Sequence, residues 1–246
     1  KTTYDAVHDP ELAPLVVTKS HLSGEKINRF TNVHRSIDDL LKKQEMTRKL
    51  CHKVGGCIQR CMGNDALNAV GIVSKEIDEA KGTSYHQNFL KFLDYFQKND
   101  LVGNAAQTDV KGDRSKRPHE QVDPDLYLRI VEKNSDGIVV KGAKAHNTTA
   151  PYCDEIIVVP TRNLTKEESD WAVAFAIPAD TEGVKLICRV TSLRKRKELK
   201  APGSEFGMAD SLTVFDNVFI PWERVFMCGE WEFGARLALL FANYHR

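Results

Sequence analysis

The hydrophobic spacing of the chain changes near residue 104, and this change constrains the fold more than any other feature of the sequence. Before it, apolar residues recur at helical spacing, which is typical of helices that bury one face. After it come short stretches of β-branched and aromatic residues between turn residues, which are typical of strands. Helical spacing returns near Trp231. The sequence therefore predicts an α+β chain whose helices and strands are segregated along its length.

These changes divide the chain into three expected regions. Residues 1–103 form an N-terminal helical domain, residues 104–228 a middle β-barrel domain, and residues 229–246 the start of a C-terminal helical domain. With 246 residues, the chain is long enough for one large or two modest domains. It ends at Arg246 in a helical pattern without a glycine or proline to stop it, so we expect it to be truncated.

The first expected helix carries most of the sequence features that suggest a site. A capping-box pattern at Ser36 and Asp39 begins it, and its apolar stripe runs on to Cys61. Two adjacent glycines interrupt that stripe and cost about 2 kcal/mol relative to alanine in a helix. We therefore expect Gly55 and Gly56 to allow the close approach of a neighbouring helix or a cofactor.

Two further helices and a set of strands complete the expected elements. The second helix is expected over about 65–80 and the third over 84–98, whose apolar face suits the core better than a cofactor site. Residues 125–133 and 138–146 are typical of a hairpin joined by an Asn-Ser-Asp-Gly turn. The apolar helical face consists of Phe89, Phe92, Leu93 and Phe96, and further strands are expected over 155–162, 171–179, 184–191 and 211–221.

Charge and composition argue against several classes of protein. Lysine and arginine number 35 against 34 aspartate and glutamate residues, so the chain lacks the basic footprint of a general nucleic-acid binder. One basic stretch, Arg194–Lys200, could meet the phosphates of a nucleotide-like ligand, although a solvated loop or strand end explains it more simply.

No run of about 18 apolar residues predicts a membrane span, and the first residues lack a secretory signal pattern. We expect a cytosolic protein.

The six cysteines are too sparse for a disulfide scaffold, so thiols or metal ligands are expected. Cys57 and Cys61 lie four positions apart. On a helix such residues share a face with Cβ atoms about 5–6 Å apart, which suits a metal clamp. Core packing is the alternative, because free cysteine behaves as a small hydrophobe and metal motifs more often place two residues between cysteines.

Six segments carry a resemblance to a known family: INRFTNVHRSIDDLLKK (27–43), CIQRCMGNDALNAV (57–70), TDVKGDR (108–114), PDLYLRIVEKNSDGIVVKGAKAHNT (124–148), VFDNVFIPWERVF (214–226) and FANYHR (241–246). Together they resemble the 4-hydroxybutyryl-CoA dehydratases, also called vinylacetyl-CoA isomerases, which are related to flavin-dependent 4-hydroxyphenylacetate hydroxylases. The resemblance implies an acyl-CoA dehydrogenase-like fold, FAD and a 4Fe-4S cluster as cofactors, an acyl-CoA substrate and a homotetramer. Family members have further sequence before Lys1 and after Arg246.

For the cluster, the resemblance implies three cysteine ligands and one histidine ligand. Cys57, Cys61 and His245 fall on three of these positions, and the last cysteine would follow shortly after Arg246. A neutral imidazole can ligate iron and, once released, can take a proton near neutral pH, so His245 would serve as both ligand and base. By residue type alone, His245 would be a helix-surface residue.

The resemblance also implies two flavin-binding segments. The loop after the first strand of the β-region supplies hydroxyl, backbone and cationic groups suited to a flavin ring and its pyrophosphate, and the end of a later strand supplies groups for the isoalloxazine. Without the resemblance, either segment would be an ordinary polar turn. The implied residues are Thr108, Asp109, Lys111, Gly112, Asp113, Arg114, His146, Asn147 and Thr148.

Three more residues match positions near the family's active site. One helical face could hold Arg48 and Gln59 close to the cysteines, whereas a surface ion pair and solvent exposure are their ordinary explanations. Asp210 departs from the family, whose members carry glutamate there, and the shorter side chain puts its role in question. With these, the implied catalytic set is His245, Thr148, Arg48, Gln59 and Asp210.

The implied reaction is the radical dehydration of 4-hydroxybutyryl-CoA to crotonyl-CoA, with vinylacetyl-CoA isomerisation. It removes hydrogen from the β-carbon, which the thioester carbonyl does not acidify, so the flavin would carry the hard step. The histidine-ligated iron would assist the departure of hydroxide. Two alternatives stay open: a flavin-dependent aromatic hydroxylase without a cluster, which has no use for the cysteine pair and the histidine, and a fragment without activity.

Overall fold

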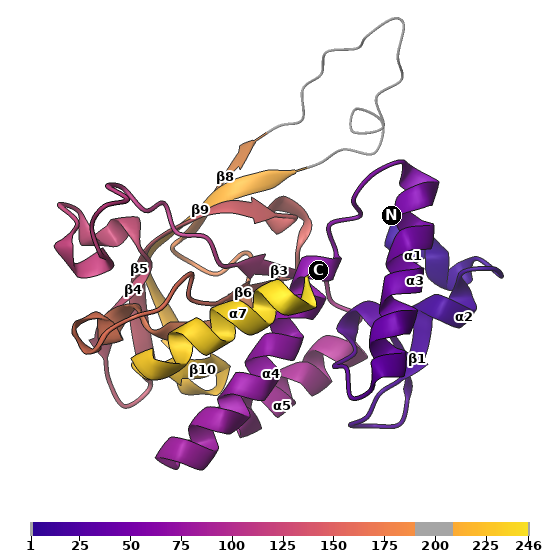
Figure 1. Cartoon of the computed structure of the whole chain (residues 1–246), viewed down its shortest axis with the longest axis horizontal. Helices are drawn as coiled ribbons and strands as arrows, with labels where there is room; N and C mark the ends of the chain where they lie inside the picture. Colours follow the sequence, from indigo (N-terminus) through magenta and orange to yellow (C-terminus); the bar gives the residue numbers. More distant parts are fainter. Residues whose placement is uncertain (1, 190–208, 246) are drawn as a thin grey trace, which may run out of the picture.

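The computed structural model describes residues 2–189 and 209–245, so the basic stretch 194–200 lies outside the described residues. Helices occupy the early part of the chain and its end, and strands lie between them (Figure 1). The α-helices are α1 (Thr2–His8), α2 (Ala13–Val16), α3 (Ile37–Val54), α4 (Cys61–Lys81), α5 (Tyr85–Lys98) and α7 (Gly234–Tyr244). Short 3-10 turns are η1 (Arg29–Thr31), η2 (Pro118–Glu120), η3 (Pro124–Leu126), η4 (Ala150–Tyr152), η5 (Lys166–Trp171), η6 (Trp222–Arg224) and η7 (Trp231–Phe233).

The strands form two four-stranded sheets and one small hairpin. The hairpin pairs β1 (Val17–Lys19) with β2 (Lys26–Asn28). The first large sheet has the order β10-β7-β6-β3, with β3 and β6 parallel, and the second has the order β4-β5-β9-β8 and is antiparallel throughout. Their strands are β3 (Gly103–Ala106), β4 (Arg129–Lys133), β5 (Gly137–Thr148), β6 (Glu155–Val158), β7 (Val173–Pro178), β8 (Val184–Arg189), β9 (Asp210–Pro221) and β10 (Val225–Cys228).

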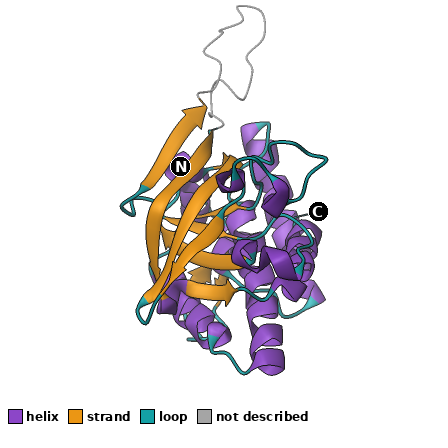
Figure 2. Ribbon diagram, turned by 90° about the vertical axis from the view of Figure 1, so that its left-hand side faces the viewer, coloured by secondary structure: helices purple, strands orange, loops and turns teal. Residues whose placement is uncertain are grey.

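Two clusters of buried hydrophobic residues lie between the layers of helices and sheets. One cluster lies between the two sheets and takes residues such as Val140 and Phe215 from one and Val158 and Phe175 from the other. Figure 2 shows the strands on one side of the molecule and the helices on the other. An isolated bridge between Asp109 and Lys144 joins the loop after β3 to β5. The expected barrel is therefore built as two facing sheets with a bridge between them.

The second cluster packs α4, α5 and α7 on the outer face of the β10-β7-β6-β3 sheet. The apolar face predicted for α5 is confirmed, because Phe89, Phe92, Leu93 and Phe96 are all buried in this cluster. Each such side chain contributes roughly 1.5–3 kcal/mol by leaving water. The hairpin predicted from the Asn-Ser-Asp-Gly turn is also confirmed, with β4 and β5 pairing on either side of it.

The expected continuous helix through both cysteines is wrong. α3 begins at the predicted capping box of Ser36 and ends at Val54, because Gly55 adopts a left-handed conformation with φ of 65°. The amide of Gly56 donates to the carbonyl of Cys51 at 3.1 Å, which completes a C-terminal cap. α4 begins only at Cys61, so Cys57 lies in the connection between the helices.

No neighbouring helix approaches Gly56 closely, and that kind of approach occurs instead at Gly63. A Cβ at Gly56 would meet no atom within 4 Å, whereas one at Gly63 would collide with the carbonyl oxygen of Gly103. The first turn of α4 therefore packs directly on the backbone at the start of β3. The approach of a cofactor to Gly55 and Gly56 stays a prediction.

We expect Gly63→Ala to destabilise the protein by about 1–3 kcal/mol, because the added methyl group meets backbone that cannot rotate away. This sign is the reverse of helix propensity, which favours alanine by about 1 kcal/mol. Urea unfolding of the purified protein measures the difference. Gly56→Ala is the control and should leave stability within about 0.5 kcal/mol. Equal unfolding midpoints for the two variants would contradict the packing explanation.

Candidate functional site

The C-terminal end of α7 meets the first turn of α4 (Figure 1) and brings together residues from distant parts of the chain. A sulfur of Cys61, a carboxylate oxygen of Asp65 and a ring nitrogen of His245 all lie within 4.8 Å of one another. α4 and α7 hold this arrangement because Leu237 and Phe241 of α7 are buried in the same apolar cluster as α4. Cys61 and His245, two of the three expected cluster ligands, therefore come together.

The third expected ligand, Cys57, lies beside Cys61 although the two do not share a helix. A hydrogen bond from the Cys61 thiol lowers the pKa of Cys57 to about 6. The same hydrogen bond, together with burial, raises the pKa of Cys61. The amide of Gln59 also donates to the Cys57 sulfur at 3.4 Å. The pair thus holds one thiolate near neutral pH, which is the form that binds metals.

Asp65 and Lys43 are residues of this site that the sequence analysis missed. Asp65 is fully buried, and one of its oxygens lies 2.8 Å from Nδ1 of His245. Its other oxygen accepts a hydrogen bond from Nζ of Lys43 in α3. That ammonium also donates to the backbone carbonyl of Tyr244 at 2.8 Å. The four-residue spacing from Cys61 to Asp65, which places both on one face of α4, was the available signal.

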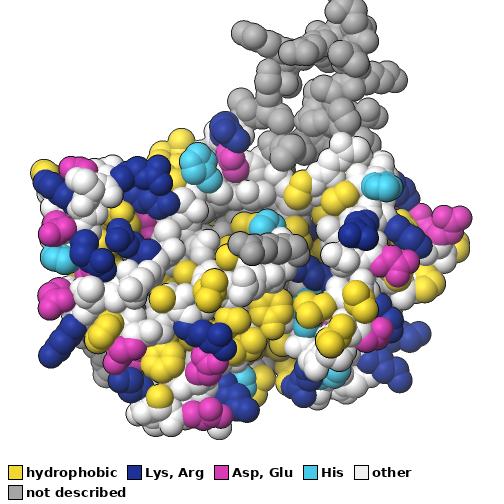
Figure 3. All heavy atoms as spheres, in the orientation of Figure 1, with side chains coloured by type: hydrophobic (Ala, Val, Ile, Leu, Met, Phe, Trp, Pro, Cys, Tyr) yellow, Lys and Arg dark blue, Asp and Glu magenta, His cyan; other side chains and the backbone are white. Residues whose placement is uncertain are grey.

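A cavity of about 580 Å³ opens beside this cluster. α3 contributes Arg48 and Thr47, α4 contributes Cys61, and α7 contributes Leu240 and Asn243 to its walls. Hydrophobic side chains gather over α7 on the face that Figure 3 shows. The cavity therefore combines a guanidinium group, a thiol and an apolar wall, and could receive a ligand with both charged and apolar parts.

Arg48 and Gln59 do not lie on one helical face, so that expectation is wrong. Arg48 is exposed on α3 and lines the cavity, whereas Gln59 lies in the connection before α4 with φ of 63°. The physical reason is the left-handed end of α3 at Gly55. Gln59 is partly buried.

The two segments expected to bind flavin lie side by side. The amide of Ala145 donates to the carbonyl of Thr108 at 2.7 Å, which joins the loop after β3 to the last part of β5. Asp109 is buried in an ion pair with Lys144, with 2.8 Å between oxygen and nitrogen. Lys111 and Gly112 continue the loop with φ of 78° and 49°, and Asp113 and Arg114 are exposed. The Asp109 carboxylate is thus engaged within the protein.

The end of β5 is irregular where the remaining candidates lie. The register of the β5–β9 ladder shifts between Lys144 and Asn147, and the exposed His146 has φ of 56°. Such bulges re-aim side chains at the rims of sheets. The Asn147 amide donates to Oγ1 of Thr213 at 2.7 Å. Thr148 pairs across the ladder with Asp210, whose carboxylate lies 2.7 Å from a guanidinium nitrogen of Arg189.

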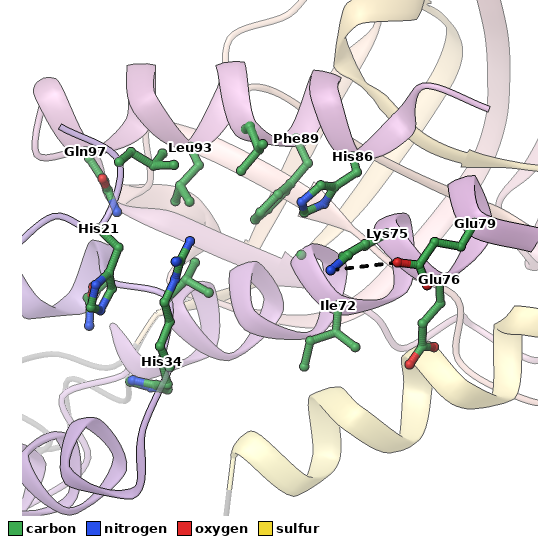
Figure 4. A pocket seen from close by; sticks show the side chains of 16 residues that line it. His21, His34, Ile72, Lys75, Glu76, Glu79, His86, Phe89, Leu93 and Gln97 are labelled. Atoms are coloured by element: carbon green, nitrogen blue, oxygen red, sulfur yellow. Dashed lines mark ion pairs between the residues drawn. The ribbon is translucent and has the colours of Figure 1, made fainter. Parts of the chain in front are cut away.

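A second cavity of about 500 Å³ lies between α4 and α5 (Figure 4). His21 and Gln97 lie at one end of it, and Lys75 forms an ion pair with Glu79 at the other. Phe89 and Leu93 line the space between. Among the residues that line it there is no cysteine, so the donors suited to iron belong to the first cavity.

His34 lines this second cavity and gives the protein an expected pH dependence. Burial lowers the pKa of His34 to about 4, compared with about 6.5 in an unfolded chain. Between these values the unfolded state binds more protons, so this contribution to stability is complete above about pH 6.5 and is lost as the pH falls toward 4. At pH 4.5 the free energy of unfolding is therefore about 2 kcal/mol lower than at pH 7.5 because of this histidine.

We expect His34→Leu to lose less stability than the wild type between pH 7.5 and 4.5, by about 2 kcal/mol. Urea unfolding at the two pH values measures the free energies. His52→Leu, at an exposed position of α3, is the control and should follow the wild type. Identical acid sensitivity in the wild type and His34→Leu would show that the buried ring does not carry this effect.

None of the helices in residues 2–189 and 209–245 has both the length and the hydrophobicity that a membrane span requires.

Comparisons with known proteins agree on one family. Residues 1–227 match the family model described as 4-hydroxyphenylacetate 3-hydroxylase N terminal. The chain is 47% identical to a 4-hydroxybutyryl-CoA dehydratase/vinylacetyl-CoA-Δ-isomerase from Clostridium aminobutyricum, over 99% of this chain and 51% of that protein. The chain thus spans about half the length of this curated relative.

Solved structures give the same result. An oxygen-tolerant archaeal 4-hydroxybutyryl-CoA dehydratase from N. maritimus superposes with a TM-score of 0.93 at 43% identity, covering 99% of this chain and 49% of that one. The oxygenase component of 4-hydroxyphenylacetate 3-monooxygenase, complexed with FAD, superposes with a TM-score of 0.81 at 25% identity, covering 98% of this chain and 49% of that one.

Proposed function

The chain belongs to the family described as 4-hydroxyphenylacetate 3-hydroxylase N terminal, and on that premise we propose that it acts as part of a 4-hydroxybutyryl-CoA dehydratase with vinylacetyl-CoA isomerase activity. The observation that carries this proposal is the meeting of Cys61 and His245 at one end of α4, with Cys57 beside them. The 47% identity to a dehydratase/isomerase supports it. An aromatic hydroxylase, the alternative, gives no reason for this donor set.

The donor set fits a 4Fe-4S cluster. Two thiols and one imidazole are soft and intermediate ligands that suit iron, and one thiol is already acidic. Because Nδ1 of His245 is engaged with Asp65, Nε2 is left as the atom that can bind iron. Cys57, Cys61 and His245 would hold the cluster, which takes about four protein ligands in all.

FAD is the second proposed cofactor. The related oxygenase component binds FAD in its solved structure. We assign the flavin to the loop after β3 and the end of β5, which lie side by side here. In the proposed site, backbone groups of 108–114 and of Asn147, the cations Lys111 and Arg114, and the side chains of His146 and Thr148 would contact it, because the Asn147 side chain is buried and bonded within the protein.

Residues of the first cavity, of the connection before α4 and of the proposed flavin site divide the work of the reaction. When bound, the flavin supplies one-electron transfer and the cluster iron supplies a Lewis acid for the leaving hydroxyl. Arg48 donates hydrogen bonds to the acyl-CoA from the cavity wall, and Leu240 helps to exclude water. Once released from iron, His245 could accept a proton only at Nε2, since the proton on Nδ1 is held by Asp65. Thr148 orients the flavin, and Asp210 and Gln59 complete the proposed catalytic set.

We also propose an oligomeric state and a division of the chain into regions. We propose a homotetramer with an acyl-CoA substrate, and a division into residues 1–103, 104–228 and 229–246. The second division point has a physical basis, because α7 packs on α4 and not between the two sheets.

Iron, acid-labile sulfide and flavin content of the anaerobically purified holoenzyme tests this function. We expect about four irons and one FAD for each copy of the chain. The same preparation should convert 4-hydroxybutyryl-CoA to crotonyl-CoA. A protein that contains flavin but no iron, and that hydroxylates a phenol, would overturn the dehydratase in favour of the hydroxylase.

A further inference from the structure

Asp65 stands at the centre of a chain of contacts that ends at the proposed iron ligand. Its carboxylate is fully buried at the first turns of α4. One oxygen faces Nδ1 of His245 at 2.8 Å and the other is held by Lys43. Lys43 is itself nearly buried. A buried carboxylate with both oxygens engaged lies fixed in one orientation.

Resting on the function proposed above, we propose that Asp65 is a positioning residue for the cluster, which fixes the tautomer and the ring orientation of His245 through a hydrogen bond at Nδ1, and that Lys43 holds Asp65 in place. Metal-bound histidines commonly donate their second nitrogen to a carboxylate in this way. Neither residue was among the expected site residues.

Direct ligation by Asp65 is the competing explanation, because its oxygen also lies within 4.8 Å of Cys61 and His245. The contacts favour positioning. Each oxygen already has a partner, and release of Lys43 would leave a buried ammonium without its counter-charge, which is unfavourable. Carboxylates also suit hard cations better than the iron of a thiolate cluster.

Two further contacts fix the same imidazole. The ring of Phe241, one helical turn earlier on α7, lies parallel to the His245 ring, with 6.3 Å between ring centres and 2° between planes. Lys43 donates to the carbonyl of Tyr244 at 2.8 Å and so ties the end of α7 to α3. The imidazole is thus held at Nδ1 and through its backbone, with the Phe241 ring parallel to it, while Nε2 has no hydrogen-bond partner among the described residues.

The inference predicts a specific defect in Asp65→Asn. The amide keeps the shape of the carboxylate but presents an NH2 group, either to Nδ1–H of His245 or to the ammonium of Lys43. We expect the iron bound to His245 to be lost to a chelator at about 10–100-fold lower chelator concentration than in the wild-type holoenzyme. The electron paramagnetic resonance spectrum of the reduced cluster should change as well.

Asp78→Asn is the matched control. Asp78 lies on the same helix and accepts hydrogen bonds from Thr83 and from the amides of Tyr85 and His86, outside the first cavity. It should lose stability while its cluster spectrum and chelator sensitivity match the wild type. If Asp65→Asn does not accumulate as folded protein, Lys43→Met provides the second test and should shift chelator sensitivity in the same direction by a smaller factor.

The outcomes separate this inference from the proposed function. An Asp65→Asn holoenzyme with wild-type iron content, spectrum and chelator sensitivity overturns the positioning role and leaves the dehydratase assignment standing. Equal iron loss in Asp65→Asn and Asp78→Asn also overturns it, because the effect is then general loss of α4. A wild-type holoenzyme without iron overturns both.

Discussion

Cys61→Ser is expected to remove the proposed iron from the holoenzyme and to lower the rate of the proposed dehydration by at least about 10³-fold, since the Lewis acid that Cys61 would help to hold would contribute several kcal/mol to the transition state. Cys61 is buried at the start of α4 beside Cys57 and His245, so its loss breaks the proposed donor set at its centre. Iron analysis, visible absorption and crotonyl-CoA formation measure the effect.

Cys228→Ser is the control for this substitution. Cys228 is also buried, but it lies on β10 in the cluster between the two sheets. A hydroxyl in its place should cost about 1–3 kcal/mol of stability and leave iron content unchanged. If Cys61→Ser keeps its iron while Cys228→Ser loses it, the assignment of the cluster to the α4–α7 end is wrong.

Lys144→Met is expected to destabilise the protein by about 3–5 kcal/mol, because it leaves the buried Asp109 carboxylate without its cation. Lys144 is buried, and burial lowers its pKa while the charge of Asp109 opposes that shift. Its ammonium also donates to the carbonyls of Gln107 and Val159 at 2.9 and 3.1 Å. One side chain therefore joins the loop after β3, the segment after β6, and β5. Urea unfolding measures the loss.

Lys141→Met is the matched control on the same strand. Lys141 forms an ion pair with Asp125 at 3.0 Å but is 42% exposed, so its removal should cost less than about 1 kcal/mol. The double variant Lys144→Met with Asp109→Leu should recover much of the lost stability, because it removes both buried charges. Equal losses in Lys144→Met and Lys141→Met would contradict the buried-pair explanation.

The contacts of Asp109 also affect the proposed flavin site. The sequence resemblance implied Asp109 as a flavin contact, whereas its carboxylate accepts hydrogen bonds from the amide of Leu128 and from Thr161 in addition to its ion pair. Flavin affinity and stability should therefore fall together in Lys144→Met. This coupling follows because the Asp109 carboxylate sets the path of the loop, and the proposed flavin contacts are the backbone of that loop and the side chains of Lys111 and Arg114.

Periodicity predicted the elements that pack by a regular face. α5 and the β4–β5 hairpin are correct because their apolar spacing and turn residues agree with their final environment. The break between α3 and α4 was missed, because the apolar stripe continues through Gly55 and only the capping chemistry of that glycine ends the helix. The two cysteines do lie close together, but Cys57 lies in the connection before α4 and the two do not share one helix as expected.

The site itself could be predicted only in part. Cys57 and Cys61 could be selected from their spacing, while His245 required the family resemblance. Asp65 had one local signal, its four-residue spacing from Cys61. Its contacts were missed because tertiary packing sets them: His245 lies 180 positions after Asp65 and Lys43 lies 22 positions before it.

The contact of Gly63 with Gly103 sets the distance between the start of α4 and the start of β3. Gly63 follows Cys61 by two positions, and Gly103 opens the strand that leads into the loop at 108–114. The segment that would hold the cluster and the segment that would hold the flavin are therefore positioned relative to one another by one main-chain contact. A substitution that shifts this contact would change the separation of the two proposed cofactor sites even if every ligand side chain were kept.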